Sequence, residues 1–341
     1  MGRSLSDLFV FVGKRLLQLI PVLLGVIILT FFVTHLNLVG LCNEWYPHAS
    51  KPVIDACDAK YSQPVANQFV SYFTGLLQGN WGASVTGVQV YPAIADDLPA
   101  TIELVLAALF LMIVIGIPLG VVAAQYSGRL GDHLVRIFYL SGWATPTYLG
   151  AVVVAVFVGP WLGLPTSGEY STTLVPFPQY THMSVIDAMI ALNLPYTVDA
   201  IAHLILPATV LAFINMGIAT RMTRASMLEV MPLDYVKAAR MKGLGEFWVL
   251  YKHALRNALI TTTTVLGITA GGLLAGTVVV EEVFDWPGIG QYAYTAIGGG
   301  GSTPNFAGAV AVVVIFAVAV VVANLVADIL YGLLDPRVDW R

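Results

Sequence analysis

Long stretches without a single Lys, Arg, Asp or Glu alternate with short charged segments along this chain. About 20 consecutive apolar residues are needed for a helix to cross the hydrocarbon core of a bilayer, and six stretches meet that length. They are residues 16–43, 104–128, 137–168, 200–220, 257–280 and, within 286–327, the apolar part from Ala307 onward. The pattern predicts six membrane-spanning helices.

Smaller features refine this pattern. Residues 188–198 are apolar but too short to cross, and they contain Pro195, so we expect an interfacial or re-entrant piece there. Pro118, Pro146 and Pro207 mark kinks or span ends. Glycines recur four residues apart at 116 and 120, at 267 and 271, and at 272 and 276, a spacing that lets membrane helices approach closely. We interpret these pairs as packing positions.

The basic residues are distributed unevenly between the two sides of the predicted bundle. Positively charged loops stay in the cytoplasm, and fourteen of the 16 Lys and Arg residues fall on one side. They are Arg3, Lys14, Arg15, Arg129, Arg136, Arg221, Arg224, Lys237, Arg240, Lys242, Lys252, Arg256, Arg337 and Arg341. The other two, Lys51 and Lys60, share the first outer loop with several acids. Both termini are therefore expected in the cytoplasm.

Composition excludes the soluble globular class. Of the 341 residues, 57% are hydrophobic and 11% charged, and the mean hydropathy is +0.80, so the chain is an all-α polytopic membrane protein. None of the uncharged stretches holds an Asp, Glu, Lys or Arg, which argues against an ion-coupled carrier. There is no phosphate-binding loop, no His-Glu-x-x-His motif and no Gly-x-Ser-x-Gly turn, and the six histidines show no metal-ligand spacing. We expect no catalytic residue and no metal site.

The chain divides accordingly. Residues 1–15 form a cytoplasmic segment, 16–38 a retained first span, 39–98 an extracytoplasmic loop, and 99–341 a core with a cytoplasmic loop at 229–256. The outer loop contains the only two cysteines, Cys42 and Cys57, on the oxidising side, so a disulfide is plausible. Its closure would contribute roughly 3 kcal/mol. Apolar residues at helical spacing between Val65 and Leu76 predict an amphipathic helix resting on the membrane or on the bundle.

One cytoplasmic segment, residues 232–257, holds five of the 16 basic residues. It predicts a short helix, a left-handed turn at Gly243 and a second helix. Small side chains make one face of the first helix nearly flat, and a basic rim surrounds that face, so a soluble partner could approach closely. The residues expected to contact that partner are Asp234, Lys237, Ala238, Ala239, Arg240, Lys242, Gly243 and Leu244. The alternative is an ordinary loop whose charges only fix topology.

This segment reads DYVKAARMKGLGEFWVLYKHALRNALI, and it resembles the cytoplasmic EAA loop of ABC-importer permeases, especially dipeptide and oligopeptide permeases. The resemblance covers nearly the whole chain. It continues, in order, through RLLQLIPVLLGV, LLQGNWGAS, LPATIEL, RMTRASMLEVMPLDYV, VVVEEVFDWPGIGQYAYTAI and DILYGLLDPRV. It implies a type I ABC importer permease fold with residues 237–244 as the coupling helix. The long first outer loop resembles that of the B-type subunit, which implies a heterodimer with a second permease.

The resemblance also implies partners and a function. The chain would be an inner or plasma membrane permease subunit of a prokaryotic importer, driven by two nucleotide-binding ATPase subunits that carry the ATP and Mg, with no cofactor in this chain and no enzymatic activity of its own. A separate extracytoplasmic binding protein would deliver di- or oligopeptides. Oligosaccharides, nickel and glutathione remain alternative substrates, because Asn80, Trp81 and residues 298–306 depart from the family pattern on the outer side. An ion-coupled carrier or channel is a remote alternative.

A second candidate site lies just beyond the fifth span, in residues 280–297. An apolar and aromatic run with a Pro-Gly turn and no basic residue cannot be a solvated linker, because its aromatic rings would lie in water. We expect it to fold back into the outer mouth of the translocation path as a gate or scoop-like loop. The residues assigned to it are Glu281, Phe284, Trp286, Pro287, Gly288 and Gly290. The alternative is an interfacial aromatic anchor.

Overall fold

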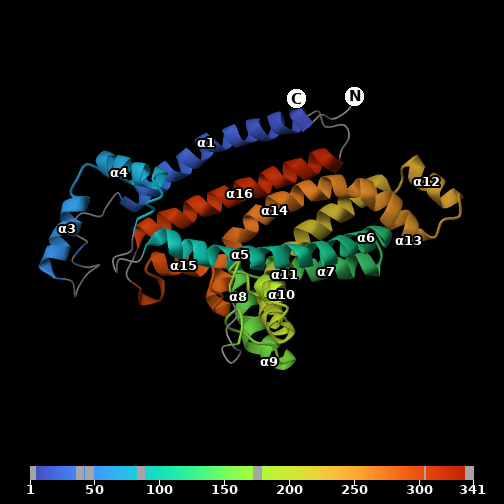
Figure 1. The fold of residues 1–341 in the computed structure, drawn as a ribbon. Coiled ribbons are helices and arrows are strands. Elements are labelled where there is room, and N and C mark those ends of the chain that lie inside the picture. The colour runs from blue at the N-terminus through green and yellow to red at the C-terminus, as the bar shows by residue number, and fades with distance from the viewer. Residues whose placement is uncertain are drawn as a thin grey trace.

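The computed structural model describes residues 5–35, 42, 50–82, 89–171, 179–302 and 305–334, and every element in these residues is helical. Long helices run side by side to make an elongated bundle (Figure 1). α3 (Lys51–Tyr61) and α4 (Val65–Leu77) lie at one end, and α12 (Asp234–Met241) lies at the other. We refer to the end with α12 as the basic end and to the end with α4 as the acidic end.

Among the residues that the structure describes, five helices are long and apolar enough to cross a membrane by themselves. α1 (Leu5–His35) and α16 (Phe306–Leu334) contribute one each. In the second, α5 (Val90–Leu111) continues through the π-helical turn η1 (Met112–Gly116) into α6 (Ile117–Gln125). The predicted fourth span is α11 (Leu194–Val230). The predicted fifth span lies in a continuous helix made of α13 (Glu246–Trp248), the π-helical turn η3 (Val249–Ala254) and α14 (Leu255–Phe284). These five match five of the predicted spans.

The predicted third span, at 137–168, is not one straight helix. α7 (Leu130–Ala144) ends at Ala144, and the chain then turns by 103° into α8 (Thr147–Val153), η2 (Val154–Val158) and α9 (Gly159–Leu162). Thr145 is extended because the ring of Pro146 disfavours a helical conformation in the preceding residue. The described residues therefore hold six spans only if this bent pair counts as one. Figure 1 shows α8 and α9 leaving the bundle beside α10 (Ser184–Ile190).

The short apolar piece at 188–198 joins the end of α10 to the first turn of α11. Pro195 occupies that first turn, where the missing N–H costs no helical hydrogen bond. The side chain of Asn193 caps the helix by accepting a hydrogen bond from the backbone N–H of Tyr196 at 3.2 Å. This piece therefore begins a long span, and it is not a separate re-entrant element.

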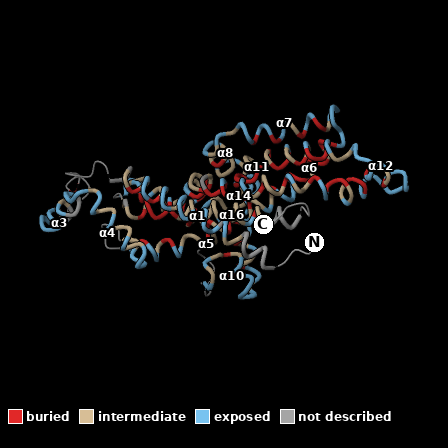
Figure 2. Tube along the Cα trace, turned by 90° about the horizontal axis from the view of Figure 1, so that it is seen from above, coloured by how far each residue is buried: buried red, intermediate tan, exposed pale blue. Residues whose placement is uncertain are grey.

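Small residues bring the central helices together, as predicted. A Cβ on Gly120 of α6 would lie 2.6 Å from Cβ of Thr223 on α11, and a Cβ on Gly267 of α14 would overlap Ala327 of α16. Any larger residue would force these helices apart. The pair at 272 and 276 behaves differently, because a Cβ on Gly272 would meet nothing within 4 Å. Figure 2 shows buried residues concentrated along this central packing and exposed ones on α3 and α12.

The predicted amphipathic helix of the first loop is α4, and it rests on the bundle. Its Phe69, Tyr72 and Phe73 pack against Ile27 of α1 and against two valines of α16. Cys42 is fully buried, whereas the side chain of Cys57 lies outside the described residues, so the disulfide stays a prediction. At the acidic end the chain continues through α15 (Ile289–Ala296) and the short turn η4 (Gly299–Gly301) into α16.

Candidate functional site

The segment 232–257 folds as the sequence predicts, into a helix, a glycine turn and a second helix. α12 begins at Asp234, whose carboxylate lies in the first turn, and it ends at Met241. Gly243 then takes a left-handed conformation, with φ of +76°, and its N–H donates to the carbonyl of Arg240 at 2.9 Å. The coupling helix predicted at 237–244 therefore starts three residues earlier and ends three residues earlier, and Leu244 lies beyond it.

Large apolar side chains are exposed around this turn, on α12, α13 and the residues between them. Met241 is 82% exposed, Phe247 63% and Trp248 59%. The exposed set, here the docking surface, is completed by Leu233, Tyr235 and Leu244. Lys237 and Lys242 are exposed beside it. An apolar patch with a charged rim is typical of a protein interface.

Ala239 does not belong to this surface, and its predicted place on an exposed flat face is wrong. Ala239 and Val236 are the buried residues of α12, where they pack into the same core as Val249 and Leu250 of η3. Ala238 is half buried. The flat side of α12 lets the helix lie close on its own chain, so the face available to a partner is the larger, mixed apolar and basic one.

Polar contacts hold α12 against the helices that follow it. Arg240 donates to Glu246 of α13 from Nη2 at 2.8 Å and from Nε at 3.2 Å. Asn257 of α14 donates to the hydroxyl of Tyr235 at 2.7 Å. The ion pair of Lys237 with Asp234 is exposed on both sides and contributes little. α12 is thus linked directly to α13 and α14.

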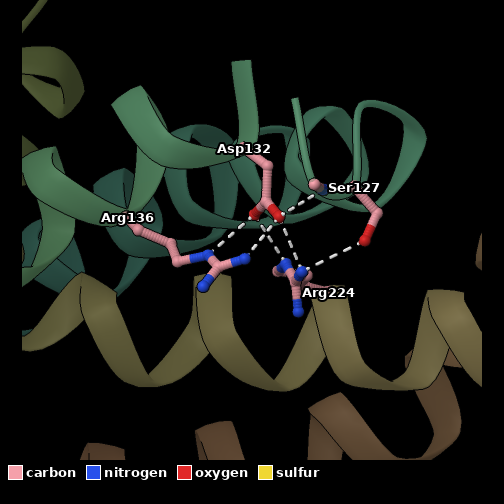
Figure 3. Close-up of polar contacts among 5 residues, drawn as sticks. Ser127, Asp132, Arg136 and Arg224 are labelled. Carbon is pink, nitrogen blue, oxygen red and sulfur yellow. Dashed lines mark hydrogen bonds and ion pairs between the residues drawn. The ribbon is translucent and has the colours of Figure 1, made fainter. Parts of the chain in front are cut away.

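A buried carboxylate organises the basic end behind the docking surface (Figure 3). Asp132, in the first turn of α7, is fully buried and accepts two hydrogen bonds from each of two arginines. Arg136 donates at 3.0 and 2.6 Å and Arg224 at 2.8 and 2.7 Å, while the N–H of Gly128 donates at 3.0 Å. Arg224 also donates to Ser127 at 3.3 Å. Two-point contacts of this kind fix both distance and orientation.

This carboxylate joins the turn between α6 and α7 to α11, the helix that leads into α12. Sequence reasoning used Arg136 and Arg224 only to orient the chain and did not identify Asp132. The spacing of Asp132 and Arg136, four residues apart on one helix, is the local signal that could have found half of the cluster. The other half comes from α11, 92 residues away.

At the acidic end, the segment from Phe284 to Gly290 turns back onto the bundle. Asp285 ends α14 with φ of +48°, and Phe284 and Trp286 are both buried. The indole N–H of Trp286 donates to the carbonyl of Ala100 on α5 at 3.0 Å. The prediction that this segment is not a solvated linker is confirmed. Trp286 lies within the core of this chain, and the gate role stays a prediction.

Glu281 holds this segment in place from inside. The fully buried carboxylate accepts hydrogen bonds from Thr101 at 2.8 Å, from the N–H of Gly290 at 2.7 Å and from the N–H of Gln291 at 3.0 Å. Burial raises the pKa of Glu281, and these hydrogen bonds partly offset that effect. A Cβ on Gly288 would overlap both Glu281 and Thr101, so only glycine fits there. Thr101 was not singled out from the sequence, because its partners are about 180 residues away.

Comparisons with known proteins agree with this architecture. The family model described as binding-protein-dependent transport system inner membrane component matches residues 116–340. The probable D,D-dipeptide transport system permease protein DdpB of Escherichia coli is 37% identical over 334 residues, which cover 95% of this chain and 96% of the relative. The di/tripeptide transport system permease protein DppB of Pseudomonas aeruginosa is 36% identical over 96% of this chain and 98% of its own length.

A solved structure of the MetNI methionine ABC transporter, in inward facing conformations, shares the fold. It aligns with a TM-score of 0.52 and 17% identity over 69% of this chain and 93% of that chain. At this identity the likeness shows the fold alone. Because the family model covers most of the chain and the relatives match along nearly all of it, this membrane-spanning chain belongs to the family of binding-protein-dependent transport system inner membrane components.

Proposed function

We propose that this chain is one of two permease subunits of an ATP-driven importer, and that it takes up di- or oligopeptides delivered by an extracytoplasmic binding protein. Relatives with 36–37% identity over nearly the whole chain carry dipeptide and di/tripeptide transport in their names, which supports the substrate class. The chain itself hydrolyses nothing in this proposal. ATP and Mg are bound by two ATPase subunits, and this chain holds no cofactor.

The observation that carries the proposal is the docking surface on α12 and α13. A membrane protein that exposes large apolar side chains at a basic, polar end needs a protein partner to cover them. In the proposal the ATPase subunit binds Met241, Phe247 and Trp248, with Lys237 and Lys242 at the rim. In the proposal the basic end and both chain termini face the cytoplasm, in keeping with the distribution of Lys and Arg.

Movement of the ATPase would reach the pathway through two helices that leave this surface. α11 has 37 residues and is therefore about 55 Å long, more than the thickness of the hydrocarbon core. α14 has 30 residues and reaches Glu281 and the segment around Trp286 at the acidic end. Closing and opening of the ATPases would tilt both helices together and so alternate access to the pathway between the two permeases.

Reconstituted transport tests this proposal. The chain is placed in proteoliposomes with the second permease, the ATPase subunits and the binding protein, and uptake of a labelled dipeptide is measured. We expect uptake that requires ATP and that disappears when the ATPase subunits are left out. Uptake driven by an ion gradient without ATPase subunits would overturn the importer assignment. ATP-dependent uptake of an oligosaccharide, nickel or glutathione, with none of any peptide, would overturn the substrate class.

A further inference from the structure

The bend in the third span lies at membrane depth. Residues 137–168 carry no Asp, Glu, Lys or Arg, but α7 and α8 meet at 103° instead of forming one helix. Thr145, at the bend, follows Arg136 by nine residues and so lies about 13 Å further along the span, near the middle of a hydrocarbon core about 30 Å thick. We name residues 143–150, on both sides of this bend, the elbow. Figure 2 shows α7 and α8 along one edge of the bundle.

The backbone of the elbow exposes polar groups that a lipid chain cannot satisfy. The N–H of Thr145 donates to the carbonyl of Gly142 at 3.1 Å. The carbonyl groups of Trp143, Ala144 and Thr145, however, accept no hydrogen bond from the residues that the structure describes. Trp143 and Ala144 are also exposed. Non-helical backbone at membrane depth occurs only where protein buries it or where it lines a water-filled cavity. The elbow therefore faces water or another protein, and not lipid.

A groove opens at the elbow, between α8 with its continuation η2 on one side and α11 on the other. Its volume is about 340 Å³, which is within the range of small-molecule sites. Leu149 and Val153 line it from α8, and Val210, Phe213 and Ile214 line it from α11. Because these side chains are apolar, the groove suits an apolar group of a ligand and not a charged one.

Arg221 places a positive charge near this groove. It follows Val210 by eleven residues and Ile214 by seven, so all three lie on the same side of α11. Its Cζ lies 5.9 Å from the centre of the indole ring of Trp143, which belongs to the elbow. In the part of the chain that the structure describes, Arg221 makes no ion pair and no side-chain hydrogen bond. Its N–H groups are therefore available to a ligand.

The charges nearest to Arg221 do not neutralise it. Asp132 is already bound to Arg136 and Arg224, so this group as a whole carries an excess of positive charge. Glu229 is exposed and lies eight residues, or about 12 Å, further along α11. An unpaired guanidinium attracts an anion, and a carboxylate matches its geometry by accepting two parallel hydrogen bonds.

The second permease is less suited to cover the elbow. Interfaces between membrane helices favour small residues, but the exposed side chains of Trp143, Tyr148 and Leu149 are large. Gly272 of α14, in contrast, is exposed, and a Cβ on it would meet nothing within 4 Å. That face of α14 offers a partner helix a closer approach than the elbow does, which favours water and a ligand at the elbow.

We propose that the elbow lines the water-filled translocation pathway and is a contact site for the transported peptide. Arg221 binds the carboxylate at the end of the peptide, and the groove receives an apolar side chain. An extended dipeptide is about 7 Å long. One molecule can reach both, since Arg221 lies at Trp143, two residues from Thr145 at the edge of the groove. This inference rests on the proposed peptide specificity, and discontinuous spans form the midplane substrate sites of many secondary transporters.

The experiment measures peptide binding to the complete complex of permeases and ATPases in nanodiscs, without binding protein or nucleotide. The probes are labelled dileucine, its C-terminal amide and dialanine. The wild type should bind dileucine at least about tenfold more tightly than the amide, as expected for hydrogen bonds to a charged group. Arg221→Gln should remove this preference. Arg129→Gln removes another exposed arginine at the same end and should leave the preference intact.

A further variant tests the groove separately from the arginine. Val153→Trp fills the groove, so it should remove the preference of the wild type for dileucine over dialanine while keeping the preference for the free carboxylate. An unchanged unfolding temperature shows that the variant is folded, and Val153→Phe, a smaller change at the same residue, replaces it if that temperature falls. Loss of both preferences together in a folded groove variant would show that the groove and Arg221 do not act on separate parts of the peptide.

Several results would overturn the inference. They are equal binding of dileucine and its amide by the wild type, no binding of dileucine, and a loss of preference in Arg129→Gln as complete as in Arg221→Gln. A cysteine in Val153→Cys that water-soluble thiol reagents cannot reach in the complex would show that protein covers the elbow, and it would overturn the inference too. ATP-driven uptake of dileucine with the binding protein is measured in parallel. Uptake without these preferences refutes the site alone, whereas no uptake of any peptide refutes the proposed function.

Discussion

The buried carboxylate of Asp132 allows a quantitative test of what holds the basic end together. Replacing Asp132 by Asn removes the negative charge but keeps the shape, and it leaves two guanidinium groups facing a neutral amide. Breaking a buried ion pair by removing one partner typically costs about 3–5 kcal/mol. The two arginines are not fully buried, since the side chains of Arg136 and Arg224 are 40% and 20% exposed, and water can solvate them in part. We therefore expect a loss of about 2–3 kcal/mol.

The loss of stability in the arginine variants should be larger for the less exposed arginine. Arg224→Ala leaves Asp132 with Arg136 alone and unlinks α7 from α11, so it should cost about 1–2 kcal/mol. Arg136→Ala removes the more exposed partner, which lies on the same helix as Asp132, and it should be the least destabilising of the three variants. Thermal unfolding of the purified protein in detergent, with denaturant series where the transition is reversible, gives the order.

The same variants test whether α7 and α11 move as one unit. Peptide uptake should fall for Asp132→Asn and Arg224→Ala at temperatures where both are still folded. Uptake by Arg136→Ala should stay close to that of the wild type. If Arg136→Ala is as harmful as Asp132→Asn, the link between helices is not the important contact. If Asp132→Asn is as stable as the wild type, the carboxylate does not organise this end and the reasoning fails.

Four further predictions concern the other sites. Gly243→Val should abolish stimulation of the ATPase by the loaded binding protein, because a β-branched residue resists φ of +76°. Gly243→Asn should retain most of this stimulation. Equal stimulation in both variants would mean that the segment is only a topological loop. Trp286→Ala should lower the free energy of unfolding by about 3–5 kcal/mol, measured by denaturant unfolding, since the indole is fully buried; a stable variant with reduced uptake would support the gate role instead. Cys42 and Cys57 should be inaccessible to thiol reagents in intact cells until reduced, and equal labelling before and after reduction would contradict the disulfide. Burial raises the pKa of Glu281, so the folded state binds the proton of this carboxyl more tightly than the unfolded state does. The free energy of unfolding should therefore fall as pH rises from about 4.5 through that raised pKa. Glu281→Gln should flatten this part of the stability–pH curve, and an unchanged curve would exclude Glu281 as its source.

Features that depend on residues close together in the sequence were predictable. Apolar run length located five spans, and the order of basic, small and glycine residues in 232–257 gave a helix, a turn and a helix. Each of these depends on the backbone and on residues within a few positions. The amphipathic helix α4 was predictable for the same reason, since its apolar spacing is a local property.

Features that depend on which side of a helix meets another helix were not predictable. The apolar run at 137–168 has the composition of one span, but the conformation of a single residue before Pro146 turns it by 103°. Ala239 has the size expected at a tight contact, and the sequence does not say whether that contact is with a partner or, as observed, with η3. Small side chains indicate that something approaches closely without identifying it.

The buried acids show the same limit most clearly, and they change how the charge pattern is interpreted. The uncharged stretches contain no Asp, Glu, Lys or Arg, yet the fully or nearly buried Asp132, Glu103 and Glu281 all lie close to the ends of those stretches. Each one is held by partners from distant segments: α11 for Asp132, α10 for Glu103, and Thr101 of α5 for Glu281. Asp132 has two arginines, and Glu281 has three hydrogen-bond donors. Glu103 accepts the N–H of Val185 at the start of α10, so each of the three acids joins segments that are distant in the sequence.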